Sequence, residues 1–146
     1  MPRINFHLQL EQLKDKLLAM AALSQQSVEY AVDAYVDRDQ RLITFVRDNE
    51  TAINLAQRDV DEMAYELLAK EQPMAIDLRF IFSVIKINAD LERIGDQSMS
   101  IARRAEDMLR YPAPKLPVDI AAMGTHASDM MRRAVQALIE ADAPLA

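Results

Sequence analysis

The chain has 146 residues, of which 51% are hydrophobic, enough for one ordinary domain with its own core. Seventeen basic residues stand against 23 acidic ones, and the net charge of −6 argues against a protein that binds nucleic-acid phosphates over a broad surface. Because the chain has no cysteine, disulfide scaffolds, thiolate metal sites and cysteine nucleophiles are excluded. The two histidines leave little room for histidine chemistry.

No segment reads as a membrane span or as a secretion signal. The longest purely apolar run covers residues 17–23, far short of the roughly 20 residues that a spanning helix needs. Residues 1–6 contain one arginine and no apolar core segment, unlike a signal peptide. We therefore expect a soluble protein of a reducing compartment, the cytoplasm.

Helix breakers divide the chain into four long stretches. Gly95 and Gly124 are the two glycines, and six prolines lie at positions 2, 73, 112, 114, 117 and 144. Hairpin dipeptides such as Asn-Gly are absent and β-alternation is weak. The sequence therefore predicts an all-α protein with helices over about residues 7–37, 39–70, 75–110 and 118–141.

Apolar residues recur every three or four positions in each predicted helix, the pattern of a helix packed in a left-handed bundle. In the third helix this seam consists of Phe80, Val84, Ile87, Leu91, Ile94, Ser98, Ile101, Ala105 and Met108. A weaker stripe in the fourth helix consists of Ile120, Met123, Ala127, Met130, Ala134 and Leu138.

The connections predict how the helices are arranged. Short polar turns at residues 37–39 and 72–73 make consecutive helices antiparallel neighbours. At about 1.5 Å per residue the first three helices are each about 45–50 Å long, so they can close one antiparallel three-helix bundle over residues 1–111. Residues 112–117 form a Pro-rich linker, and residues 118–146 hold a fourth helix outside that bundle.

Oxygen-bearing side chains gather on two neighbouring helices. Glu92 and Asp96 are one turn apart in the third helix, and Glu50 and Asn54 have the same spacing in the second. If the turn is centred near Pro73, facing residues have numbers that add up to about 146, which places Asn54 opposite Glu92 and Glu50 opposite Asp96. Hard cations, iron and manganese accept such ligands. We call these four residues the acidic patch.

Other interpretations of the same residues are open. Arg47, Arg58 and Arg103 lie near the acidic patch in sequence and could turn it into a solvated face of ion pairs. Asn88, one turn before Glu92, is expected on the same outward face. Gly95 costs roughly 0.8–1 kcal/mol inside a helix, so it indicates either a close helix approach or access of a ligand to the patch.

Three motifs at fixed distances carry a resemblance to a known family. Gln72-Pro73 is followed by Asp77-Leu78-Arg79, and then by Asp90-Leu91-Glu92-Arg93-Ile94-Gly95-Asp96. With these motifs the chain closely resembles the PhoU family of phosphate-signalling regulators over about residues 5–110.

The resemblance implies two three-helix bundles in tandem, with residues 118–146 as the first helix of a second bundle. It also implies a site for iron or another divalent or trivalent metal ion, onto which Glu92, Asp96, Glu50 and Asn54 map. Asn54 stands where the family often has an acid, which removes one negative charge from the site.

The function that the resemblance implies is regulatory and not enzymatic. PhoU proteins repress the phosphate regulon and high-affinity phosphate uptake, acting between the phosphate ABC transporter and its sensor histidine kinase. We therefore expect peripheral association with these membrane proteins only, and no nucleic-acid partner. Because a lone fourth helix would expose its apolar stripe, we expect it to pack on its own bundle or to join two chains in a homodimer.

Two competing functions remain at this stage. A metal-dependent hydrolase could use a cation on the acidic patch to activate water, although the sequence offers it no histidine base and no recognisable pocket motif. A structural three-helix bundle without metal would leave the patch as a solvated face.

Overall fold

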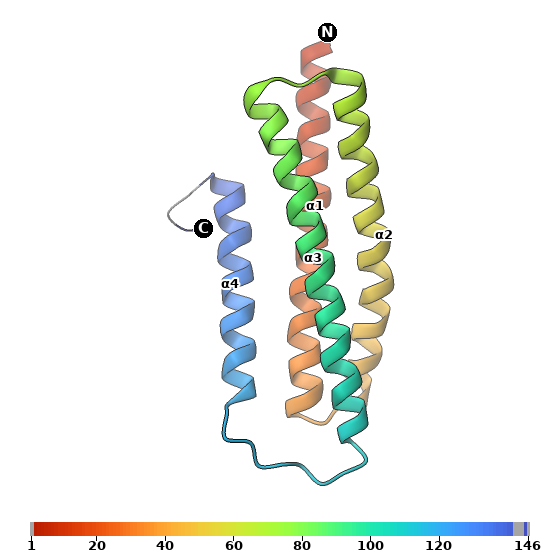
Figure 1. The fold of residues 1–146 in the computed structure, drawn as a ribbon, viewed down its shortest axis with the longest axis vertical. Coiled ribbons are helices and arrows are strands. Elements are labelled where there is room, and N and C mark those ends of the chain that lie inside the picture. Colours follow the sequence, from red (N-terminus) through yellow and green to blue (C-terminus); the bar gives the residue numbers. More distant parts are fainter. Residues whose placement is uncertain (1, 142–144, 146) are drawn as a thin grey trace.

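The computed structural model describes residues 2–141 and 145, and it is all-α over these residues (Figure 1). Its helices are α1 (Pro2–Val36), α2 (Gln40–Glu71), α3 (Ala75–Met108) and α4 (Ile120–Glu140). The predicted fold class is confirmed, and most helix ends lie within two residues of the predicted ones. The exception is the start of α1, five residues earlier than predicted, because Pro2 is well suited to the first turn of a helix.

Local capping explains where the helices begin and end. Asp39 precedes α2, and its carboxylate accepts a hydrogen bond from the backbone N–H of Arg41 at 2.9 Å. Asp119 caps α4 in the same way, through the backbone N–H of Ala122 at 3.0 Å. Gln72 ends α2 in the left-handed conformation, with φ of 44°, and so turns the chain toward α3.

Helices α1, α2 and α3 form an antiparallel bundle whose core has two apolar parts. Near the N-terminus of α1, the larger part is built from buried residues that include Leu13, Leu17, Met20, Ile53, Val60 and Ile81. Toward the C-terminus of α1, the smaller part includes Ala31, Ile43, Val46, Met99 and Ala102. Small residues fill the bundle between these parts, and the buried Ser24 hydroxyl donates to the carbonyl of Leu91 at 3.0 Å.

The inward face of α3 differs from the predicted seam at alternate positions. Val84, Leu91, Ser98 and Ala105 are buried as predicted. Between them, however, the buried residues are Asn88, Gly95 and Ala102, while Ile87, Ile94 and Ile101 are only half-buried. The prediction that Asn88 faces outward is therefore wrong. Its side chain is completely buried, because the spacing of four and three residues that connects the buried positions passes through it.

Helix α4 packs along α1, which confirms the expectation that it packs on its own bundle (Figure 1). The contact uses Gly124, whose missing Cβ would lie 2.6 Å from Val32, and Ser128, whose hydroxyl donates to Glu29 at 2.6 Å. These small residues let α4 approach α1 closely. Because Gly124 and Ser128 face α1, most of the predicted apolar stripe of α4 points away from α1. Its residues Met123, Ala127, Met130 and Ala134 are exposed.

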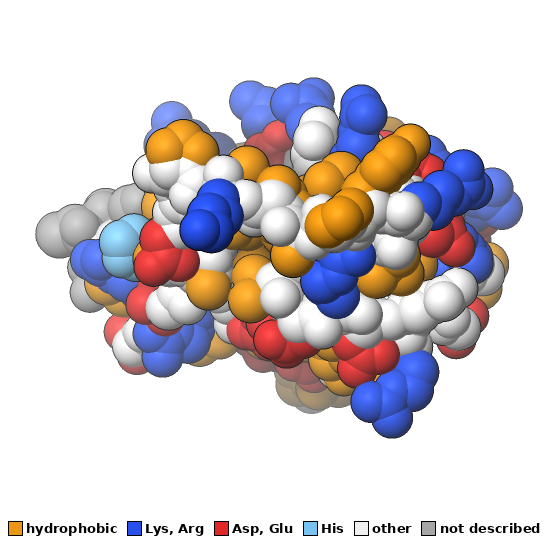
Figure 2. All heavy atoms as spheres, turned by 90° about the horizontal axis from the view of Figure 1, so that it is seen from below, with side chains coloured by type: hydrophobic (Ala, Val, Ile, Leu, Met, Phe, Trp, Pro, Cys, Tyr) orange, Lys and Arg blue, Asp and Glu red, His pale blue; other side chains and the backbone are white. Residues whose placement is uncertain are grey.

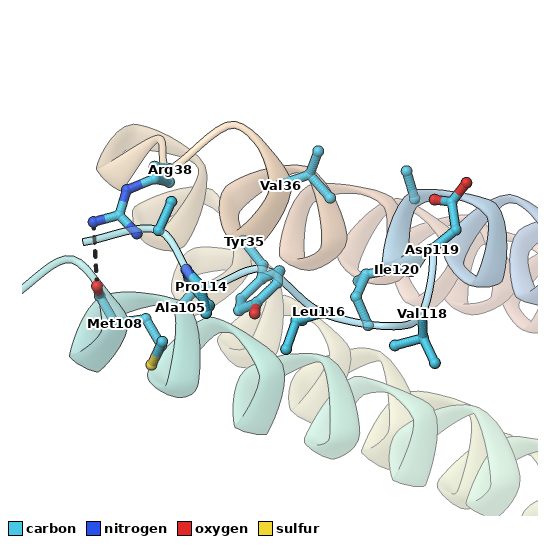
Figure 3. Close-up of a pocket in the computed structure, with 12 residues that line it drawn as sticks. Tyr35, Val36, Arg38, Ala105, Met108, Pro114, Leu116, Val118, Asp119 and Ile120 are labelled. Carbon is cyan, nitrogen blue, oxygen red and sulfur yellow. Dashed lines mark hydrogen bonds between the residues drawn. The ribbon is translucent and has the colours of Figure 1, made fainter. Parts of the chain in front are cut away.

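The end of the bundle away from the N-terminus is closed by Arg38, in the turn between α1 and α2. Its guanidinium donates to the carbonyl of Met108, the last residue of α3, at 3.2 Å (Figure 3). It also donates to the carbonyl of Tyr111 at 2.6 Å. In the connection between α3 and α4, Tyr111, Leu116 and Val118 are exposed at this end. Apolar and basic side chains lie side by side when the molecule is seen from there (Figure 2). No helix among residues 2–141 has the length and apolarity needed to cross a bilayer.

Candidate functional site

The acidic patch begins with Glu92 and Asp96 on adjacent turns of α3. Glu92 is half-buried and Asp96 is exposed. Burial raises the pKa of Glu92, and a hydrogen bond and the negative charge from Asp96 raise it further. Because two carboxylates cannot share a hydrogen bond without a proton, the pair resists being fully ionised. A bound cation would relieve the same repulsion.

Glu50 brings α2 into this arrangement. It is half-buried, and its negative charge also raises the pKa of Glu92. Asp96 and Glu50 are therefore both close enough to act on Glu92 electrostatically. Asn54, one turn further along α2, is exposed, and its side chain takes part in none of the hydrogen bonds found among the described residues.

Helices α2 and α3 approach each other closely beside the acidic patch. Gly95 lies between Glu92 and Asp96 in sequence and is buried against Ile53. A Cβ at Gly95 would lie 3.0 Å from Cδ1 and 3.3 Å from Cγ2 of Ile53, closer than ordinary van der Waals contact. Of the two explanations for Gly95, the structure thus supports helix packing.

The contacts between the two helices lie close to the predicted register. The Asn88 amide donates to the carbonyl of Gln57, and the numbers of these two residues add up to 145; Gly95 packs against Ile53, whose numbers add up to 148. The charge of Glu50 reaches Glu92, so residues of both helices act on each other at the patch. The pairing of Asn54 with Glu92 and of Glu50 with Asp96 stays a prediction.

The basic residues near the patch in sequence leave its carboxylates without an ion pair. Arg47 pairs with Glu106 at 3.4 Å. None of the ion pairs found among residues 2–141 includes Glu50, Glu92 or Asp96. Arg93 lowers the pKa of Glu92, but this effect is smaller than the opposing ones. The ion-paired solvated face is therefore not what the structure shows, and the patch keeps a negative charge that no partner neutralises.

Asn88 is a buried polar residue, although the sequence predicted it on the outward face of the helix. Its amide donates to the carbonyl of Gln57 at 2.9 Å and to the carboxylate of Asp61 at 3.0 Å, which ties α3 to α2. Its Oδ1 atom is buried without a hydrogen-bond partner. The signal that could have found it is the spacing of buried positions on α3, since Asn88 lies three residues before Leu91.

The described residues do not form a ready-made metal centre. Nowhere in residues 2–141 do three histidine or carboxylate side chains converge closely enough to hold one metal ion. The chemistry of the acidic patch suits a hard cation, because it offers carboxylate and amide oxygens and an uncompensated negative charge. Loading would require rearrangement of these side chains. Metal binding at Glu92, Asp96, Glu50 and Asn54 therefore stays a prediction.

A cavity lies where the C-terminal end of α1 meets the start of α4, and its charged residues have structural roles. Its volume is about 380 Å³, and its lining includes Tyr35, Met108 and Leu116 (Figure 3). The two charged residues in its wall are already engaged: Arg38 holds the end of α3, and Asp119 caps α4. The acidic patch is thus the stronger candidate site.

Comparison with known proteins places this geometry in a family. A family model described as the PhoU domain matches residues 17–105, more than half of the chain. The chain belongs to the PhoU family. The match to the PhoU domain includes the whole acidic patch and all but the last three residues of α3.

Individual PhoU relatives agree with that assignment. The PhoU homolog of Pseudomonas aeruginosa, a phosphate-specific transport system accessory protein, is 38% identical over 142 residues, which are 97% of this chain and 59% of that protein. The PhoU protein of Escherichia coli K12 is 28% identical, over 94% of this chain and 57% of its own length. The chain therefore spans somewhat more than half the length of these relatives.

A solved PhoU structure shares the fold. The crystal structure of PhoU from Pseudomonas aeruginosa superposes with a TM-score of 0.92 at 38% sequence identity. The match covers 96% of this chain and 68% of that one, so it includes α4 as well as most of the bundle.

Proposed function

We propose that this chain is a non-enzymatic regulator of phosphate homeostasis that acts in the cytoplasm, between the phosphate ABC transporter and its sensor histidine kinase. The observation that carries the proposal is the PhoU domain match over residues 17–105. The names of the relatives support an accessory role beside a phosphate-specific transport system and do not describe an enzyme. Repression of the phosphate regulon and of high-affinity uptake is the direction of control that the family resemblance implies.

Direct binding tests this role. The full 146-residue chain would be immobilised, and the detergent-solubilised transporter and the kinase would be passed over it separately. We expect saturable binding of both. Failure of both to bind, with a helical circular-dichroism spectrum that shows the chain to be folded, would contradict the proposal.

We further infer that the acidic patch binds iron or another divalent or trivalent metal ion through Glu92, Asp96 and Glu50, with Asn54 as a neutral oxygen ligand. The support is electrostatic: burial and neighbouring carboxylates raise the pKa of Glu92, and no basic residue is paired with the three acids. When bound, the metal would replace the shared proton as the charge that holds the patch together.

Self-association belongs to the same proposal. We propose that two copies of this chain form a homodimer, and the support is the exposed apolar stripe on α4.

A further inference from the structure

The outer face of α3 carries four basic side chains in one line. Arg79, Lys86, Arg93 and Arg104 are all exposed, and we call them the basic stripe. They follow one another at intervals of seven, seven and eleven residues, which are close to two, two and three whole turns of an α-helix. The four side chains therefore lie above one another along about 38 Å of α3.

The basic stripe is directed away from the core of the bundle. Each of its residues is two positions from a buried residue of α3, and two positions correspond to a rotation of about 200° around the helix. The buried residues in question are Ile81, Val84, Gly95 and Ala102. Helix α4 packs along α1, and none of the described helices covers the outer face of α3 (Figure 1).

The charges of the basic stripe are not used within the described part of the chain. None of the ion pairs or side-chain hydrogen bonds found among residues 2–141 includes a residue of the stripe. Arg93 lowers the pKa of its neighbour Glu92 without pairing with it. By contrast, Arg38 holds the end of α3 and Arg47 pairs with Glu106. The stripe thus keeps its hydrogen-bond donors for a group outside the chain.

The positive surface of the stripe is only about one helix wide. Asp90 borders it on the side of the α4 groove, and Asp96 of the acidic patch borders it on the side of α2. A broad anionic surface, such as a bilayer or a nucleic acid, would also meet these carboxylates on a chain whose net charge is −6. A narrow anionic partner would meet the cations alone.

We propose that the basic stripe binds an acidic helix of a partner protein, which lies lengthwise along α3. A partner helix repeats its own faces at the same intervals of seven and eleven residues, so its carboxylates can meet each cation of the stripe in charge-assisted hydrogen bonds. Phe82 and Ala89, exposed between the cations, add apolar contact. This inference rests on the proposed function, because the partner is the transporter or the kinase, and it is independent of metal binding.

Binding of the full chain to the detergent-solubilised transporter and to the kinase tests the stripe. Lys86→Glu/Arg104→Glu reverses two of its charges and is expected to weaken the binding of at least one partner by at least about tenfold. The matched control, Lys16→Glu/Arg133→Glu, makes the same change in net charge at exposed positions of α1 and α4, and its dissociation constants are expected to stay within about twofold of wild type. Lys86→Arg/Arg104→Lys keeps the charges and is expected to bind like wild type. Because all four sites are exposed, every variant is expected to keep its helix content.

Salt and lipid tests identify what occupies the stripe. Wild-type binding is expected to weaken between about 50 and about 300 mM KCl, and more steeply than that of the stripe variant. Vesicles of phosphatidylcholine with about 30% phosphatidylglycerol are expected not to bind the chain. Binding to these vesicles that the stripe variant loses would overturn the inference, because the stripe would then recognise a lipid surface.

The binding results separate this inference from the proposed function. If the stripe variant binds both partners as tightly as wild type, or if the stripe and control variants are weakened equally, the inference is overturned and the proposed function stands. A folded wild-type chain that binds neither partner would overturn both.

Discussion

Gly95 determines how closely α2 and α3 approach beside the acidic patch. It lies in the α3 interior, where glycine costs roughly 0.8–1 kcal/mol relative to alanine. The missing side chain of Gly95 leaves space for Ile53, which packs against it and is almost fully buried. Packing in the core thus outweighs helix propensity at this position.

We predict that Gly95→Ala destabilises the protein by about 1 kcal/mol, because overpacking costs about 1–3 kcal/mol and exceeds the gain in helix propensity. Urea unfolding measures the change. In an Ile53→Val background, which removes the Cδ1 atom 3.0 Å from the new Cβ, the same substitution is expected to cost less. Equal costs in both backgrounds would show that Ile53 is not the residue that requires glycine.

Glu92 makes stability depend on pH in a defined direction. Burial, Asp96 and Glu50 raise its pKa above the ordinary value of 4.5, so the folded protein holds this proton more tightly than the unfolded chain does. The stability gained from that proton is fully present below pH 4.5 and is lost as the pH rises through the raised pKa.

We therefore predict that Glu92→Gln, measured without metal, is more stable than wild type by about 0.5 kcal/mol at pH 7, and that the difference disappears near pH 4. Thermal unfolding at the two pH values measures it. Glu62→Gln, an exposed carboxylate of α2, is the control and is expected to show no such difference. A Glu92→Gln variant less stable than wild type at pH 7 would contradict the electrostatic description of the patch.

Among the helical elements, α3 depends on a side chain that is distant in sequence for its C-terminal end. The guanidinium of Arg38 donates to the carbonyls of Met108, Leu109 and Tyr111, which lie at the last residue of α3 and just after it. We predict that Arg38→Ala lowers the free energy of unfolding by about 1–2 kcal/mol, since hydrogen bonds from a charged donor are lost.

The matched control for Arg38 is Arg41→Ala, three residues further along, in the first turn of α2. The Arg41 side chain is 86% exposed and pairs with Asp39 at 3.1 Å, so its removal is expected to cost clearly less than the removal of the Arg38 side chain. The Asp39 cap on α2 is kept, because it involves the backbone of Arg41. Equal losses in urea unfolding for both variants would contradict the special role of Arg38.

The helices themselves are predictable from the sequence, while their exact rotation is not. On α3, apolarity favours Ile87 and Ile94 as inward residues, but Asn88 and Gly95 are the buried ones. At Gly95 the side chain of Ile53 leaves no room for a Cβ, and at Asn88 the amide donates hydrogen bonds to Gln57 and Asp61 of α2. On α4, Gly124 and Ser128 likewise replace the apolar stripe at the contact with α1. Hydrophobic periodicity locates large side chains, and it misses contacts made by small ones.

For the molecule as a whole, the bundle and the position of its acidic patch follow from the sequence, while the fine geometry of the patch depends on tertiary packing. The spacing of Glu92 and Asp96 places both on one face of α3 at any register. How Glu50 approaches them depends on where the α2–α3 turn is centred, which the position of Pro73 predicts only approximately. Neither the metal nor the partners are determined by helix geometry.

Metal content is the measurement that tests the central claim most directly. The chain would be purified without chelator after growth with iron, and its metals determined by elemental analysis beside the variant Glu92→Gln/Asp96→Asn. The control is Glu11→Gln/Asp15→Asn, an exposed pair with the same spacing on α1. We predict bound metal in the wild type and the control, and its loss in the patch variant. Wild-type protein without metal, or metal retained in the patch variant, would contradict the assignment of the acidic patch as a metal site.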